Sequence, residues 1–210
     1  MATDTQMQTQ APVTITGDPV YENRHPITVE EYFQIINSGA LGPEPKVELI
    51  EGVIVDKMTK NNPHIIATDL VQILFGRLMP AGYYSSMGNP VIIKARNSVP
   101  EPDAVVARGN PRDIRSQGRL PESTALAVEV ADTSYALDRN RKSQLYASAG
   151  IPIFWLLDLN RRRLEVFSNP TGQDDQARYE KTDLFEEKQE APFVLDGQEI
   201  GRFAISEILP

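Results

Sequence analysis

Two neighbouring stretches decide the fold: Ala125-Leu-Ala-Val-Glu-Val-Ala131 and Asp138-Arg-Asn-Arg-Lys-Ser-Gln-Leu-Tyr-Ala-Ser-Ala-Gly150. The first is a short apolar run that contains one acid, as expected for a buried strand. The second places Lys142 at helical spacing from Leu145 and Tyr146, so the lysine shares the core-facing stripe of a helix. A buried strand followed by such a helix predicts a fold that combines a sheet with covering helices.

Both stretches carry a charged residue where an apolar one is expected. In the strand, Glu129 shares its face with small alanines, while the larger aliphatic side chains point the other way. Small neighbours leave room for an ion and its waters. Because a buried acid or ammonium is costly unless it is paired, Glu129 and Lys142 predict either a metal-assisted active site or a structural ion pair.

The length of the chain predicts one domain with ample residues for a core. It has 210 residues, and we expect residues 27–210 to form a single α/β or α+β domain with a mixed sheet flanked by helices. Residues 1–26 are polar and rich in Thr, Gln and Pro, and are predicted to be a disordered tail.

Upstream of the deciding stretches, the sequence predicts a helix, a hairpin and a second helix. Thr28-Val-Glu-Glu31 reads as a capping box, and Glu51-Gly52 as the turn of an N-terminal hairpin made of residues 47–50 and 53–56. Asn62-Pro63 predicts a helix with Asn62 as its N-cap. The residues expected to form the apolar face of that helix are Ile66, Leu70, Ile73, Leu74 and Leu78.

The rest of the chain predicts mainly strands. We expect strands around residues 83–95 and 103–107, a surface loop over 108–123, and β additions at the C-terminus with a hairpin turn at Asp196-Gly197. Two further strands are expected over 153–158 and 162–167.

Composition excludes several classes of protein. The absence of cysteine excludes disulfides, thiolate metal sites and a cysteine nucleophile. The chain has no apolar run of the roughly 18 residues that a membrane helix needs. The first residues lack the basic and apolar regions of a signal peptide, so a cytoplasmic protein without membrane association is expected.

Charge argues against a broad nucleic-acid surface, because the net charge is −8. The acidity is concentrated near the C-terminus: residues 169–210 hold four basic and ten acidic side chains. Residues 134–168 are basic, with six basic side chains against three acidic ones.

Four polar residues are misplaced for a purely structural role: Glu48, Asp103, Glu129 and Lys142. Asp103 opens a short strand, and carboxylates on adjacent strands provide the hard oxygen ligands that Mg²⁺ prefers. A lysine beside such an ion can orient the attacking water and offset charge in the transition state. The pattern therefore predicts a Mg²⁺ site, with Mn²⁺ as a substitute, suited to an anionic substrate.

Several short motifs stand in the order seen in a known family. They are Glu48-Leu-Ile-Glu-Gly52, Pro63-His64, Pro102-Asp103, Val128-Glu-Val-Ala-Asp-Thr-Ser134, Asp138-Arg139, Lys142, Tyr146, Ala149-Gly150 and Trp155-Leu-Leu-Asp158. In this ordered set the chain resembles the Uma family of restriction endonucleases, formerly a domain of unknown function, in the PD-(D/E)xK nuclease superfamily. The resemblance covers residues 27–210, and its specificity lies in the set rather than in any one motif.

The resemblance implies a restriction-endonuclease-like core and a Mg²⁺-dependent endonuclease acting on DNA. Asp103 corresponds to the acid of the PD motif and Glu129 to that of (D/E)xK. The superfamily lysine would fall at Ala131, so the resemblance implies that its role has moved to Lys142 in the helix. Asp103, Glu129 and the backbone carbonyl of Val130 are the expected metal ligands, and Lys142 the residue that positions the attacking hydroxide.

Alternatives stay open for the other polar residues and for the function. Glu48 is either an additional metal ligand or an exposed hairpin acid, and His64 either approaches phosphate or has a structural role. Asp138 is expected to fix the helix start. The rival function is a DNA- or protein-binding module with the nuclease fold and little or no activity. A homodimer is an option that the sequence leaves open.

Overall fold

The structure, a computed structural model, describes residues 24–115 and 118–210. Its centre is a six-stranded sheet in the order β3-β4-β5-β6-β7-β8. The strands are β3 (Tyr83–Met87), β4 (Ala104–Arg108), β5 (Thr124–Ala131), β6 (Ile153–Asp158), β7 (Arg163–Thr171) and β8 (Arg178–Glu186). β5 and β6 pair in parallel and the other neighbours are antiparallel, because the chain between β5 and β6 crosses back over the sheet as a helix.

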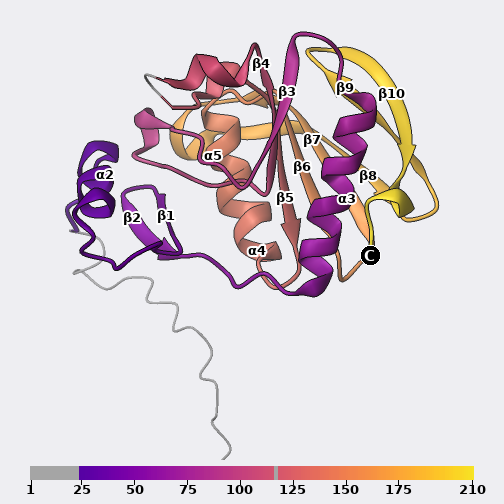
Figure 1. The fold of residues 1–210 in the computed structure, drawn as a ribbon. Coiled ribbons are helices and arrows are strands. Elements are labelled where there is room, and N and C mark those ends of the chain that lie inside the picture. Colours follow the sequence, from indigo (N-terminus) through magenta and orange to yellow (C-terminus); the bar gives the residue numbers. More distant parts are fainter. Residues whose placement is uncertain (1–23, 116–117) are drawn as a thin grey trace, which may run out of the picture.

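Helices cover both faces of this sheet (Figure 1). One face packs against α3 (Asn62–Leu78) and the C-terminal hairpin of β9 (Glu190–Leu195) and β10 (Gln198–Ala204). On the other face lies a helical segment made of α4 (Tyr135–Leu137), a π-helical turn (Asp138–Lys142) and α5 (Ser143–Ser148). The predicted mixed sheet flanked by helices is therefore confirmed.

The alternation predicted for β5 is confirmed along most of the strand. Leu126, Val128 and Val130 belong to the core under α3, whereas Ala127 and Ala131 belong to the core under α5. Ala125 is an exception: it joins the α3 core, next to the point where a bulge shifts the register between β4 and β5.

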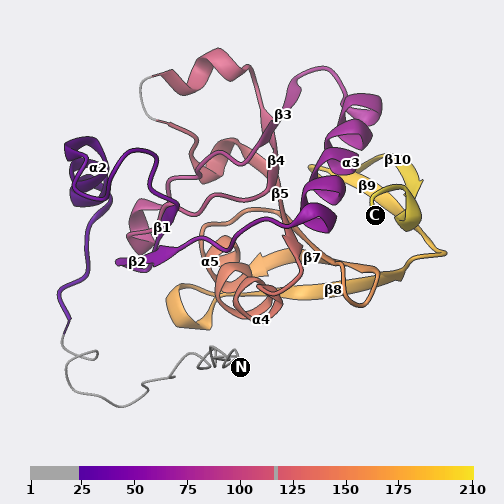
Figure 2. The same ribbon diagram turned by 60° about the horizontal axis from the view of Figure 1, so that its bottom comes forward.

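The N-terminal elements form a separate layer beside α5, which Figure 2 shows from below. α2 (Val29–Ser38) begins at the predicted capping box, in which Thr28 and Glu31 bond reciprocally. β1 (Val47–Ile50) and β2 (Val53–Asp56) form the predicted hairpin. Its turn residues Glu51 and Gly52 both have positive φ, and a Cβ on Gly52 would lie 2.6 Å from Cβ of Pro26, so glycine is required there.

Two predictions about α3 need correction. Its N-cap is Asn61 rather than Asn62, because the Asn61 side chain accepts a hydrogen bond from the backbone N–H of His64 at 3.1 Å. The predicted apolar face is wrong in part: Leu74 is buried and Leu78 packs against the core as expected, but Ile66 and Ile73 are exposed. The other buried residues of the helix are Ala67, Val71 and Phe75. Both sides of this helix are apolar, so periodicity alone does not select the buried side.

The segment after β3 departs from the expected long strand. β3 ends at Met87, and the chain then runs irregularly, with isolated bridges such as Leu49 to Val99. The loop expected over 108–123 contains short 3₁₀ turns at Pro111–Arg115 and Pro121–Ser123. At the C-terminus, the predicted hairpin turn at Asp196-Gly197 is confirmed between β9 and β10.

The predicted tail of residues 1–26 lies almost wholly outside the described residues, so its disorder stays a prediction. In the part of the chain that the structure describes, no helix is both long and apolar enough to cross a bilayer.

Candidate active site

A cavity of about 140 Å³ lies where the N-terminal hairpin, the start of α3 and the π-helical turn meet the sheet. Its buried charged side chains come from the hairpin, the sheet and the helical segment: Glu48 of β1, Asp103 just before β4, Glu129 of β5, and both Asp138 and Lys142 of the π-helical turn. The sequence separates these residues by more than 90 positions, and the fold brings them together.

Lys142 is buried among three carboxylates. Its Nζ lies 3.0 Å from Oε1 of Glu129, 3.3 Å from Oε2 of Glu48 and 3.6 Å from Oδ1 of Asp138. Only 6% of the residue is exposed. Burial alone would lower the pKa of Lys142, but the charges of the three carboxylates raise it above its ordinary value, so the lysine stays protonated.

The π-helical turn places Asp138 and Lys142 on the same inward side. They are four residues apart, and both are buried while Arg139 and Arg141 between them are not. Turns of this kind are rare inside helices and occur often at functional sites.

Glu129 is fixed from the helix side. It accepts hydrogen bonds on Oε1 from Tyr146 at 2.6 Å and from Lys142 at 3.0 Å. Burial, together with the negative charges of Asp138, Asp103 and Glu48, raises the pKa of Glu129 well above its ordinary value despite the opposing charge of Lys142. The carboxyl therefore sits in a surplus of negative charge.

Asp103 has its own set of partners at the other side of the cavity. Oδ2 accepts a hydrogen bond from the backbone N–H of Val130 at 2.9 Å and lies 3.1 Å from Nε2 of His64, while Oδ1 pairs with Nζ of Lys60 at 2.9 Å. Burial by itself would raise the pKa of Asp103, but His64, Lys60 and the Val130 N–H together lower it to about 2. Asp103 is therefore held ionised.

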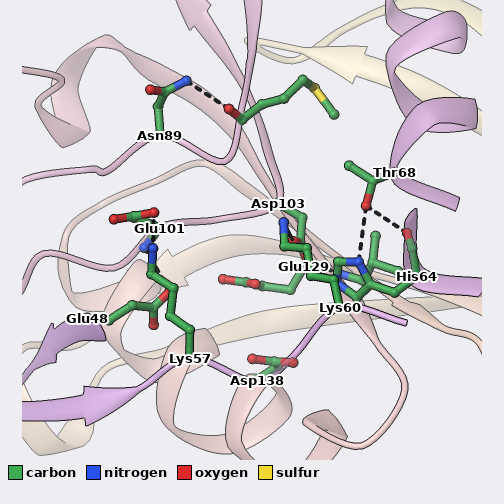
Figure 3. A network of polar contacts seen from close by, with 12 residues as sticks. Glu48, Lys57, Lys60, His64, Thr68, Asn89, Glu101, Asp103, Glu129 and Asp138 are labelled. Carbon is green, nitrogen blue, oxygen red and sulfur yellow. Dashed lines mark hydrogen bonds and ion pairs between the residues drawn. The ribbon is translucent and has the colours of Figure 1, made fainter. Parts of the chain in front are cut away.

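Glu48 completes the ring of acids. Its Oε1 accepts a hydrogen bond from the backbone N–H of Glu101 at 3.1 Å, and the Glu101 side chain in turn pairs with Lys57. Figure 3 shows the carboxylates of Glu48, Glu129 and Asp138 turned toward a common space, with Asp103, Lys60 and His64 beside it. Glu48 is thus a buried cavity residue and not an exposed hairpin acid.

The donor set suits a hard divalent cation. Four buried carboxylates of this cavity are paired with only two lysines, Lys142 and Lys60, so a bound cation would offset the remaining negative charge. The N–H of Val130 points to Asp103, and the N–H and C=O of one strand residue point to the same side. β4 starts at Ala104, whose partner is Val128, so the Val130 carbonyl lies beyond the end of β4. No three His, Asp or Glu side chains of residues 24–115 and 118–210 already form a group that could hold a metal ion.

The structure thus brings the sequence-predicted residues to one cavity but pairs them in a way the sequence did not indicate. Lys142 contacts Glu129, a pairing that the sequence offered as one alternative, whereas Asp103 is paired with Lys60 and His64. Asp138 was expected to fix the helix start, but the helical segment begins at Tyr135, and Asp138 lies inside it as a buried partner of Lys142 at the i, i+4 spacing.

Two further residues were also missed. Tyr146 was expected to be core, and it is buried, but it also bonds Glu129. Its spacing of four from Lys142 placed it on the same stripe, which was a usable signal. Lys60 carried no signal, because its position in a connecting segment has no periodicity.

Comparison with known proteins identifies the family of the chain and a protein of similar fold. A family model described as "Putative restriction endonuclease", Uma2, matches residues 29–200. The chain belongs to the Uma2 family. No protein with a curated description matches it.

A solved structure shares the fold of this Uma2 protein. It is the crystal structure of "a putative nuclease belonging to DUF820" from Anabaena variabilis, with a TM-score of 0.60 and 16% sequence identity. The match covers 87% of this chain and 97% of the other. At this identity the likeness concerns the fold alone.

Proposed function

We propose that this protein is a Mg²⁺-dependent endonuclease that hydrolyses phosphodiester bonds in DNA. The observation that carries the proposal is a buried lysine held by three carboxylates in a cavity with an excess of negative charge, in a member of a restriction endonuclease family. A structural ion pair has no need of a surplus of acids, whereas a metal site does.

Asp103, Glu129 and the backbone carbonyl of Val130 are the residues that would hold Mg²⁺, or Mn²⁺ in its place. When bound, the ion would supply Lewis-acid polarisation of the scissile phosphate and lower the pKa of a bound water. Glu48 and Asp138 are close enough to Lys142 to contribute negative charge to the same site.

The residues of the chain itself would do the positioning. The Lys142 ammonium would orient the attacking water and offset the charge that develops on the phosphate. Tyr146 holds Glu129 at 2.6 Å, and the N–H of Val130 together with His64 holds Asp103, so both carboxylates are oriented before substrate arrives.

A binding module without catalysis is the second candidate, and two observations favour it. The net charge is −8, and the described residues contain no preformed group of three metal-binding side chains. In that case the ring of acids around Lys142 would be a structural network, and DNA or protein would bind without being cleaved.

The test is nicking of supercoiled plasmid during a titration of Mg²⁺ and of Mn²⁺. We expect metal-dependent nicking by the wild type and none by Asp103→Asn or Glu129→Gln. Glu199→Gln, which removes an exposed acid on β10 far along the chain from the cavity, is the matched control and should nick like the wild type. DNA binding by the wild type with no nicking at any metal concentration would favour the binding module.

A further inference from the structure

Residues 57–61 line the cavity and attach to three different parts of its wall, and the half-exposed side chain of Lys60 lies at its mouth. Lys57 pairs with Glu101, Lys60 pairs with Asp103 at 2.9 Å, and Asn61 donates a hydrogen bond to Oδ2 of Asp132 at 2.5 Å. Figure 3 shows Lys57 beside Glu101 and Glu48, and Lys60 beside Asp103 and His64. The segment thus places two ammonium groups at an acid-rich cavity.

The contact of Lys60 with Asp103 differs in kind from the other contacts of that carboxylate. Val130 and His64 reach Asp103 from β5 and from the first turn of α3, which are regular elements with fixed positions. Lys60 reaches it from a connecting segment, and 47% of its side chain is exposed against 9% for Asp103. Among these three partners, Lys60 is therefore the one that can leave without disturbing an element of the fold.

A displaced Lys60 would stay close to the cavity. The next residue, Asn61, caps α3 and bonds Asp132, so the chain is anchored directly after Lys60. A lysine stem has four carbons and a freely rotating ammonium, which lets the charge move within the mouth while the backbone stays in place. A polyanionic substrate approaching a ring of acids needs a positive charge there.

We infer that Lys60 has two successive roles: it is the counter-ion of Asp103 until a divalent cation replaces it, and it then contacts the phosphate of the bound DNA. This inference rests on the proposed function, since it takes Asp103 as a metal ligand and DNA as the substrate. Lys60 would then be a substrate contact at the cavity mouth. Removal of its charge would strengthen metal binding and weaken DNA binding.

The first measurement is Mn²⁺ affinity of the full chain by calorimetry, without DNA. Lys60→Gln should bind Mn²⁺ about fivefold more tightly than the wild type, because a partly exposed ion pair no longer has to be broken. Lys57→Gln is the matched control: it removes the same charge from the same segment, but its partner is Glu101. Its Mn²⁺ affinity, like that of the remote variant Lys188→Gln, should stay within about twofold of the wild type.

The second measurement is affinity for a labelled DNA duplex in Mn²⁺, taken from KM where the duplex is cut and from fluorescence anisotropy where it is not. Lys60→Gln should weaken this affinity about fivefold, with kcat changed by less than about twofold, because a phosphate contact contributes to binding more than to the chemical step. The DNA affinity of Lys60→Gln should also depend less on salt concentration, by the amount that corresponds to about one lost phosphate contact. Lys188→Gln should match the wild type in both respects.

Each result decides the inference. Equal tightening of Mn²⁺ binding in Lys60→Gln and Lys57→Gln would mean a general charge effect and would overturn the counter-ion role. Unchanged DNA affinity in Lys60→Gln would overturn the phosphate contact. A wild type that binds no Mn²⁺ would overturn the metal site and the proposed function as well. A wild type that binds Mn²⁺ and DNA but does not cut would overturn only the proposed catalysis.

Discussion

Two buried groups of charged side chains lie at the same level of one sheet face, and they differ in how their charges are balanced. Glu129 of β5 and Glu165 of β7 are both register partners of Leu156 in β6, so both side chains project from the same face. Both are almost fully buried. The two glutamates therefore occupy equivalent positions in the sheet and differ only in the side chains that contact them.

Around Glu165 the protein supplies its own balance. The carboxylate bonds Tyr135 at 2.6 Å, Arg139 at 3.0 Å and Arg163 at 2.8 Å. With the neighbouring Asp158 and its partner Arg161, this arginine group has three cations for two acids. The arginines neutralise both acids, so this group needs no bound cation.

Around Glu129 the acidic side chains outnumber the basic ones. Three carboxylates share Lys142, and Asp103 across the cavity shares Lys60, so acids outnumber cations two to one. The pKa of Glu129 is raised by its burial and by these neighbours. Burial alone therefore does not mark an acid as functional, since Glu165 is equally buried. Glu129 is the functional candidate because the surrounding cations do not balance the acids beside its cavity.

The largest expected effect separates the two groups by activity. Lys142→Met should lower the rate of DNA cleavage by about 10³-fold or more, because it removes the charge that orients the water and stabilises the transition state. Arg163→Met, its counterpart in the arginine group, should leave the rate within about threefold of the wild type. Single-turnover cleavage of a labelled duplex measures both, and equal losses in the two variants would contradict the distinction.

The second expected effect separates them by stability. Glu165→Gln should lower the free energy of unfolding by about 2–3 kcal/mol, since it leaves Arg139 and Arg163 without their buried partner, and both arginines are partly exposed. Glu129→Gln in a buffer without divalent ions should cost little or be stabilising, because it removes one of several crowded acids. Urea unfolding in EDTA gives both values. A larger loss for Glu129→Gln than for Glu165→Gln would show that the two groups are alike.

A third effect distinguishes acids within the cavity by pH. The folded-state pKa of Asp103, about 2, lies below its ordinary value of 3.8, so the ionised carboxylate stabilises the fold above about pH 4. This contribution, about 2 kcal/mol, is lost as the pH falls through about 2. The difference in unfolding free energy between the wild type and Asp103→Asn should therefore shrink between about pH 6 and pH 2.5.

Glu129 should behave in the opposite sense. Its pKa is raised, so ionisation costs stability as the pH rises above the ordinary value of 4.5. In metal-free buffer the free energy of unfolding of Glu129→Gln should therefore increase relative to that of the wild type as the pH rises. Parallel pH profiles for the Asp103 and Glu129 variants would contradict the assignment of opposite shifts.

The smallest expected effect is the response to metal. At a tenfold excess over Kd, Mn²⁺ should stabilise the wild type by about 1.4 kcal/mol. Glu165→Gln should gain as much, since its group takes no part in the metal site, and Glu129→Gln should gain nothing. Thermal unfolding with and without Mn²⁺ measures the shifts, and an equal shift in Glu129→Gln would place the metal elsewhere.

The sequence by itself determined the elements that carry the candidate site. A period of two placed Glu129 on the face of β5 that lies under α5, and helical spacing placed Lys142 on the buried side of its helix. The turn at Glu51-Gly52 fixed the hairpin that carries Glu48. These features are local, and their periodicity or turn chemistry is readable from a few consecutive residues.

Tertiary structure alone decided which side chains meet. α3 is apolar on two sides, and the sheet with the β9–β10 hairpin selected Ala67, Val71, Leu74 and Phe75 for burial in place of Ile66 and Ile73. Lys60 reaches Asp103 because residues 57–61 line the cavity, a path that no local pattern encodes. Charge balance around a buried acid is likewise a sum over residues far apart in the chain, so the sequence located Glu129 and Lys142, and only the packed structure revealed the surplus of acids around them.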